Sequence, residues 1–254
     1  MLLAHELIGR HDASELVLIH GITQSRHVWH PLLRSLAENH RVLAVDLRGH
    51  GDSESCDPYA PADYASDVIE TARSLGFSSP IVVGHSLGGI VATAYAAECP
   101  CAAVVNIDQP LRLSGFKEAL TSIEPLLRGD ESAFRETIDA VFTAMNGPLP
   151  AAEQARILSH SRFDQAVVLG TWESVLGSSE AELDAMVESM VAGITVPYLA
   201  IHGEDPGLGY ADWLSALIPS ATVEVWPGHG HYPHLVDPSR FLARLAEFEV
   251  QVHG

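Results

Sequence analysis

The sequence predicts an α/β fold, with a mostly parallel central sheet, helices on both faces and a helical cap inserted into it. Three observations indicate this architecture. Short runs rich in Val, Ile and Leu alternate with helix-like segments over the first 110 residues, which is typical of a buried parallel sheet. The strand-like runs stop between 111 and 193 and then resume. No repeat or polar linker separates these parts, which favours one domain with an insertion.

Each expected element has its own signal in the sequence. Continuous apolar runs predict strands at 15–20, 41–46, 80–85, 103–108, 196–203 and 222–228. Helical periodicity predicts helices near 27–38, 62–75 and 86–98, and an amphipathic last helix at 238–250. Between 111 and 193 apolar residues recur at helical spacing. We therefore expect a core made of 1–110 and 194–254 and a helical cap at 111–193.

Composition narrows the classes of partner. The chain has 254 residues, 47% of them hydrophobic, and its 14 Lys and Arg against 33 Asp and Glu give a net charge of −19. Such a charge repels nucleic acid and anionic membrane surfaces, so we expect a small-molecule substrate. No apolar run reaches the roughly 20 residues of a membrane span. An odd number of cysteines (Cys56, Cys99, Cys101) and an N-terminus unlike a signal peptide favour the cytoplasm.

One pentapeptide carries a signal for nucleophilic chemistry. Gly84-His85-Ser86-Leu87-Gly88 matches the G-x-S-x-G pattern and lies between an expected strand and an expected helix. A serine on this sharp turn has strained backbone angles, and the flanking glycines avoid Cβ clashes. The helix that follows turns its free N–H groups toward the same point, which favours an anionic intermediate. These features predict that Ser86 is a nucleophile rather than part of a plain turn.

A serine hydroxyl needs a base to become a good nucleophile. Three histidines (His229, His231 and His234) lie in the loop between the last strand and the last helix. This loop begins at the same edge of the sheet as Ser86. Zinc sites usually add Cys or carboxylate ligands at regular spacing, and that pattern is not evident here. We therefore expect a base in this loop and neither a metal nor an organic cofactor.

Five motifs, spread over nearly the whole chain, carry a resemblance to a known family. They are LIHGITQSRHVW at 18–29, AVDLRGHGDS at 44–53, VVGHSLGG at 82–89, LAIHGEDP at 199–206 and PGHGHYPHLVDPSRF at 227–241. In this order they resemble the α/β-hydrolase fold family. The resemblance implies that His231 is the base, because Gly230-His231-Tyr232 and the later Asp237-Pro238 fit the family's frame. It also implies an oxyanion hole made by the backbone amides of Ile22 and Leu87.

The acid that orients the base is where the sequence departs from the family's pattern. The family commonly places an aspartate three residues after the glycine that ends the penultimate strand, and here that residue is Pro206. Asp205 lies one residue earlier, in a turn that is shortened. Asp108, after the strand that follows the nucleophile helix, is the alternative, at a position that some members use. Both keep the chain order Ser, Asp, His. We expect Asp205 and keep Asp108 as the alternative.

The expected function follows from these residues. We expect the cap to roof Ser86, with Trp29, Phe142, Met145 and Trp172 as candidate pocket residues. No Lys or Arg cluster accompanies the motifs, which favours small neutral esters. The prediction is a carboxylesterase that works through an acyl-enzyme. The alternatives are carbon–carbon bond hydrolysis, lactone hydrolysis, cofactor-free dioxygenase-like chemistry and a non-catalytic small-molecule receptor. Relatives that use an aspartate nucleophile, the haloalkane dehalogenases and epoxide hydrolases, are disfavoured by Ser86.

Overall fold

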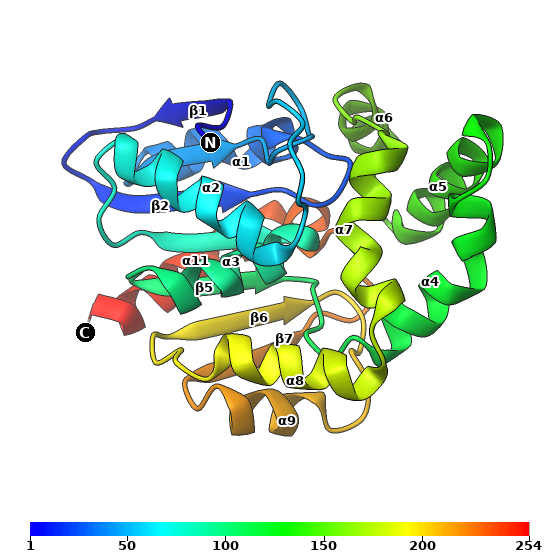
Figure 1. Cartoon of the computed structure of the whole chain (residues 1–254). Helices are drawn as coiled ribbons and strands as arrows, with labels where there is room; N and C mark the ends of the chain where they lie inside the picture. Colours follow the sequence, from blue (N-terminus) through cyan, green and yellow to red (C-terminus); the bar gives the residue numbers. More distant parts are fainter. Residues whose placement is uncertain (254) are drawn as a thin grey trace.

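A single seven-stranded sheet organises the molecule (Figure 1). The computed structural model describes residues 1–253, and the sheet has the order β1-β3-β2-β4-β5-β6-β7. The strands are β1 (His5–Ile8), β2 (Ser14–Ile19), β3 (His40–Val45), β4 (Ile81–His85), β5 (Ala103–Ile107), β6 (Tyr198–His202) and β7 (Ala221–Val225). Only β1 runs antiparallel to its neighbour, and the other pairs are parallel. This confirms the predicted α/β fold and its six predicted strands.

The strands at the centre of the sheet are buried on both faces. Every residue of β3, β4, β5 and β6 is buried, which is why these strands read as continuous apolar runs. The first strand, β1, has the sequence HELI and alternates between exposed and half-buried positions. It pairs with β3 at the edge of the sheet. Its short, half-polar sequence explains why no strand was expected there.

Helices cover both faces of the sheet (Figure 1). One face carries α2 (Pro61–Ser74), α3 (Leu87–Glu98) and α9 (Tyr210–Leu217), and their apolar residues share one core cluster. The other face carries α1 (His30–Ala37) and α11 (Pro238–His253), whose residues belong to a second cluster. A 3₁₀ turn, η1 (Arg26–Trp29), precedes α1, and the short α10 (Pro233–Val236) precedes α11. Among the described residues, no helix is long and apolar enough to cross a membrane.

Five helices lie between β5 and β6, as the helical insertion predicts. They are α4 (Ser114–Leu127), α5 (Glu131–Met145), α6 (Ala151–Ser159), α7 (Gln165–Gly177) and α8 (Glu180–Val191). Three begin at a side-chain cap, on Asp130, Asp164 and Ser179. In Figure 1, α4 to α7 stand beyond the carboxyl ends of the parallel strands. The last of the five, α8, packs beside α3 instead.

Candidate active site

The turn at Ser86 has the geometry that the pentapeptide predicts. Ser86 has φ 52° and ψ −124° and precedes the first residue of α3. A Cβ on Gly84 would lie 1.8 Å from the carbonyl oxygen of Gly88, and one on Gly88 would lie 2.2 Å from that of Ile19. The Ser86 amide donates to the Ile107 carbonyl at 2.9 Å. Only glycine therefore permits this close packing, which holds the strained serine at the carboxyl edge of the sheet.

The loop after β2 lies directly against the serine. A Cβ on Gly21 would lie 3.1 Å from the Cβ of Ser86. Leu87 is the first residue of α3, so its N–H has no partner within the helix. Ile22 and Leu87 both line the cavity that contains Ser86. Ile22 and Leu87 therefore share the cavity with Ser86, near the positive end of the α3 dipole, which favours negative charge.

His231 is paired with Asp108. The Nδ1 atom of His231 lies 2.7 Å from Oδ2 of Asp108, and the other carboxylate oxygen accepts a hydrogen bond from the Gly203 amide at 2.8 Å. Burial raises the pKa of Asp108, but the hydrogen bond and charge of His231 and the Gly203 amide outweigh it, and the pKa falls below its usual value. An ionised Asp108 keeps the Nδ1 proton on His231 and leaves Nε2 free to accept one.

The structure does not pair Asp205 with His231, contrary to our expectation. Asp205 is exposed and its carboxylate accepts a hydrogen bond from the Gly207 amide at 2.9 Å. The cause lies in the turn after β6. A Cβ on Gly203 would lie 1.7 Å from the carbonyl oxygen of Gly230, so the histidine loop packs directly on Gly203. The amide of Gly203 is hydrogen-bonded to Asp108, and Asp205, two residues on, lies exposed in the lining of the cavity.

The three loop histidines occupy different environments. The Nδ1 atom of His229 lies 3.0 Å from the Trp226 carbonyl, His231 faces Asp108, and His234 is fully buried. Among the side chains described, those of residues 1–252, no group of three His, Cys, Asp or Glu is placed to hold a metal ion.

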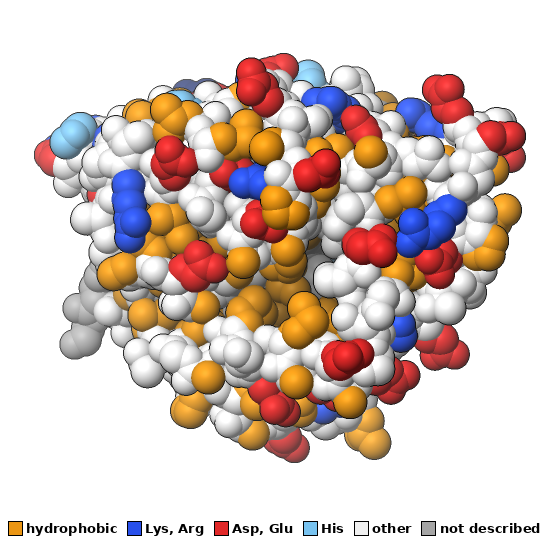
Figure 2. Space-filling view, in the orientation of Figure 1, with side chains coloured by type: hydrophobic (Ala, Val, Ile, Leu, Met, Phe, Trp, Pro, Cys, Tyr) orange, Lys and Arg blue, Asp and Glu red, His pale blue; other side chains and the backbone are white. Residues whose placement is uncertain are grey.

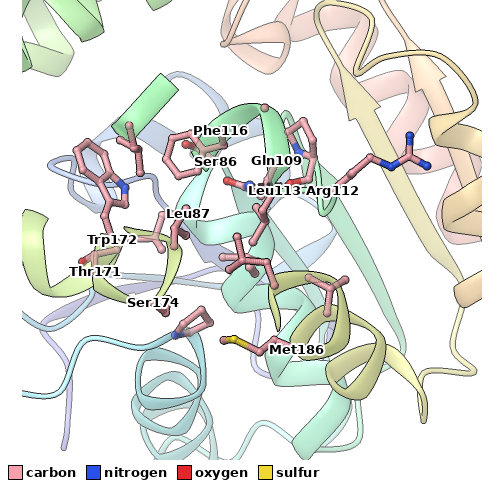
Figure 3. A pocket seen from close by; sticks show the side chains of 18 of the residues that line it. Ser86, Leu87, Gln109, Arg112, Leu113, Phe116, Thr171, Trp172, Ser174 and Met186 are labelled. Atoms are coloured by element: carbon pink, nitrogen blue, oxygen red, sulfur yellow. Dashed lines mark hydrogen bonds between the residues drawn. The ribbon is translucent and has the colours of Figure 1, made fainter. Parts of the chain in front are cut away.

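A cavity of about 1690 Å³ lies between the sheet edge and the inserted helices, and both Ser86 and His231 line it. Figure 3 shows Ser86, Leu87, Phe116 and Trp172 around one end of it. Of the expected pocket residues, Phe142, Met145 and Trp172 line this cavity. Trp29 does not. Its ring is fully buried and lies 5.0 Å from that of His234, because η1 turns it into the core on the other face of the sheet.

Sequence reasoning also missed residues that only the fold brings to the cavity. Gln109 and Arg112 follow Asp108, and Met186 comes from α8. None of them lies in a motif, so no local signal marks them. Among the cavity-lining residues of the described chain, Arg112 is the only Lys or Arg. Its guanidinium lies 4.9 Å from the ring of Trp213 and donates to the Leu208 carbonyl at 3.4 Å. Figure 3 shows the side chain extending away from Ser86.

Four histidines around the site are completely buried. His20 donates to the Gly21 carbonyl and accepts from the Leu47 amide, and His85 donates to the main-chain carbonyl of His231 at 2.8 Å. Burial lowers the pKa of His20 to about 4 and that of His50 to about 3. Burial lowers the pKa of His234 to about 3 and that of His85 well below its usual value. The fold therefore holds these rings neutral.

We expect the free energy of unfolding to fall as the pH drops below 6.5. The unfolded histidines bind protons near pH 6.5, whereas these folded ones bind them only near pH 3 to 4. The contribution of these buried histidines to the free energy of unfolding is complete above pH 6.5. It is lost as the pH falls toward 4, at about 1 kcal/mol per histidine and pH unit. Urea unfolding at pH 7.5 and 5.5 measures the loss.

A variant at one buried ring provides the control for this acid sensitivity. Neither ring nitrogen of His234 has a hydrogen-bond partner in the described structure, and the ring packs near Trp29 and Phe241. His234→Phe should therefore reduce the difference in stability between the two pH values. An unchanged difference in this variant would contradict the assignment of the effect to His234.

Comparison with known proteins finds relatives that match nearly the whole chain. A model of the alpha/beta hydrolase family matches residues 16–245. A 2-(acetamidomethylene)succinate hydrolase of Mesorhizobium japonicum is 32% identical over 245 residues, covering 92% of this chain and 87% of that protein. A pimeloyl-(acyl-carrier protein) methyl ester esterase of Pectobacterium atrosepticum is 26% identical over 249 residues, covering 92% of this chain and 94% of the esterase.

Solved structures have the same fold. The crystal structure of an E-2-(acetamidomethylene)succinate hydrolase is 25% identical, with a TM-score of 0.78 over 97% of this chain and 94% of that one. An enol-lactonase from Burkholderia xenovorans has a TM-score of 0.79 at 20% identity, over 98% of this chain and 96% of the lactonase. At that identity the likeness is one of fold alone.

Proposed function

Because the chain belongs to the alpha/beta hydrolase family, we propose that it is a serine hydrolase that cleaves neutral carboxylic esters through an acyl-enzyme on Ser86. The observation that carries this proposal is the hydrogen-bonded pair of His231 and Asp108 in the cavity that also contains the strained Ser86. This set supplies the nucleophile, base and orienting acid that acyl transfer requires.

In the proposed mechanism, His231 Nε2 takes the proton of the Ser86 hydroxyl as its oxygen attacks the ester carbonyl. The oxyanion that forms accepts hydrogen bonds from the amides of Ile22 and Leu87. His231 then gives the proton to the alcohol oxygen, the alcohol leaves, and Ser86 carries the acyl group. The same ring takes a proton from water, which attacks the acyl-enzyme, and then returns that proton to the Ser86 oxygen as the acid leaves. Asp108 stays ionised and stabilises the imidazolium in both halves.

The charge around Ser86 supports a neutral substrate. One relative acts, by its name, on a succinate derivative, which carries two carboxylates. In the described cavity lining here, Arg112 is the single Lys or Arg, and it is bonded to the Leu208 carbonyl. The Arg112 side chain extends away from Ser86 (Figure 3), and placing a carboxylate beside Ser86 with no cation in contact costs several kcal/mol. Another relative is, by its name, a methyl ester esterase, which also favours ester cleavage.

A substrate panel tests the proposed reaction. We expect turnover of p-nitrophenyl acetate and butyrate, and much slower cleavage of a simple lactone and of a vinylogous diketone, because their leaving groups are poorer or tethered. Cleavage of the lactone or the diketone without that of the esters would overturn the proposal. So would a ligand-induced rise in Tm with no product from any of the compounds, which would indicate a receptor.

A further inference from the structure

Two helices turn apolar faces toward each other beside Ser86. Most of the apolar cavity-lining residues of α3 and α8 recur at spacings of three and four, which places them on one face of each helix. They are Leu87, Ile90, Ala94 and Ala97 on α3, and Leu183, Met186, Val187 and Met190 on α8, and Glu98, Glu182, Ala185 and Ser189 of the same helices also line the cavity. We call the space between these two faces the α3–α8 groove. Figure 2 shows a hollow with a hydrophobic floor in the region where α3 and α8 lie in Figure 1.

The groove leads from the serine toward the far edge of the sheet. The helix α3 joins the parallel strands β4 and β5, and α8 leads into the parallel strand β6. Both helices therefore run from the carboxyl edge of the sheet, where Ser86 lies, toward the amino edge. At about 1.5 Å per residue, Ala97 is about 16 Å from Ser86 along α3. An extended chain advances about 1.2 Å per bond, so roughly a dozen bonds cover this length.

The lining of the groove suits an alkyl chain. Ala97 is small and exposed and leaves room, and the flexible thioethers of Met186 and Met190 adapt to an unbranched chain. Met186 is 47% exposed, and Figure 3 shows it extending from α8 at the end of the pocket away from Trp172. The charged residue that lines the far end on α3 is Glu98, which disfavours a carboxylate at the end of the chain.

The position of His231 decides which half of an ester lies in the groove. The alcohol oxygen must face His231, because it receives the proton from that ring. The segment that follows α5 lies against the loop that carries His231, since a Cβ on Gly147 would lie 3.4 Å from the Cα of Gly230. The alcohol is therefore expected under α5, near Phe142 and Met145, and the acyl group on the opposite side. This assignment rests on the proposed acyl-enzyme mechanism.

We propose that the α3–α8 groove binds the acyl chain of the substrate, and that this chain is unbranched, uncharged and about eight to twelve carbons long. Each methylene that leaves water favours binding by about fourfold. The groove is partly open, so the total gain in affinity is smaller than full burial of the chain would give. We expect kcat/KM to rise at least tenfold from p-nitrophenyl butyrate to the laurate. Lengthening the alcohol, from ethyl to dodecyl acetate, should bring no such rise.

Substitution at the far end of the groove tests the position of the chain. Ala97 is exposed and lines the groove, so Ala97→Phe should block its end without disturbing the core. The ratio of kcat/KM for the laurate to that for the butyrate should fall about tenfold or more. Ala152→Phe is the matched control, because Ala152 is an exposed alanine of α6 outside the cavity lining. Its ratio should equal that of the wild type.

Failure of this inference and failure of the proposed function give different results. One contrary result is ester turnover that needs Ser86 and yet does not rise with the length of the acyl chain, and another is turnover that rises with the length of the alcohol instead. Either result would overturn the assignment of the acyl chain to the α3–α8 groove and leave the proposed esterase function standing. If no ester is cleaved, the binding of methyl esters to the Ser86→Ala protein tests whether the groove holds an acyl chain. Methyl laurate should raise its Tm more than methyl butyrate, and adding Ala97→Phe should remove the difference. Equal rises in Tm with both esters would overturn the proposal that the groove binds the acyl chain.

Discussion

Asp108→Asn should lower kcat/KM for p-nitrophenyl butyrate by about 10⁴-fold, whereas Asp205→Asn should keep most of the activity. The carboxylate of Asp108 lies 2.7 Å from Nδ1 of His231. With the asparagine oxygen accepting from the Gly203 amide, its NH2 group faces Nδ1 and donates to it, so the ring carries its proton on Nε2, which no longer accepts one. Asp205 is exposed and is bonded to the Gly207 amide.

Stability measurements separate an orienting role of Asp108 from a merely structural one. An asparagine oxygen can still accept the hydrogen bond from the Gly203 amide, which Asp108 accepts at 2.8 Å. Asp108→Asn should therefore keep a cooperative unfolding transition within a few kcal/mol of the wild type. Equal activity of the two variants, or collapse of Asp205→Asn alone, would contradict the assignment of Asp108 as the acid.

The sequence was sufficient for the parts of the fold that local patterns encode. All six predicted strands are present because parallel strands buried on both faces need unbroken apolar runs. The turn at Ser86 could be found because the strand, the flanking glycines and the helix are neighbours in the chain. His231 could be placed in the same region because its loop follows the last parallel strand. Their catalytic roles stay predictions that the experiments here address.

Features that depend on packing between distant segments could not be predicted from local sequence patterns. The choice between Asp108 and Asp205 turns on the contact of Gly203 with Gly230, which no spacing rule contains. Trp29 was expected in the pocket because its motif adjoins the loop beside Ser86, yet η1 turns it to the other face of the sheet. The groove between α3 and α8 required the relative placement of two helices more than 80 residues apart.

Ser86→Ala should abolish ester turnover almost completely, by a factor on the order of 10⁶ in kcat where the triad acts as a unit. The variant keeps the backbone that supplies the Leu87 amide, so any remaining rate reflects binding and oxyanion stabilisation alone. It should also stay folded, because the Ser86 hydroxyl makes no hydrogen bond to another side chain in the described part of the chain and a methyl group fits the same turn. Initial rates with p-nitrophenyl butyrate measure the loss, and a rate close to the wild type would rule out Ser86 as the nucleophile.

A covalent adduct on Ser86 is the most direct sign that the reaction passes through an acyl-enzyme at this residue. The wild-type protein is treated with a fluorophosphonate ester, which reacts with activated serines, and its intact mass and peptide fragments are measured beside those of Ser86→Ala. An acyl-enzyme mechanism predicts one phosphonyl group per chain, located on Ser86, and none on the variant. An unlabelled wild-type protein, or a label on another residue that also forms on Ser86→Ala, would contradict an acyl-enzyme at this serine.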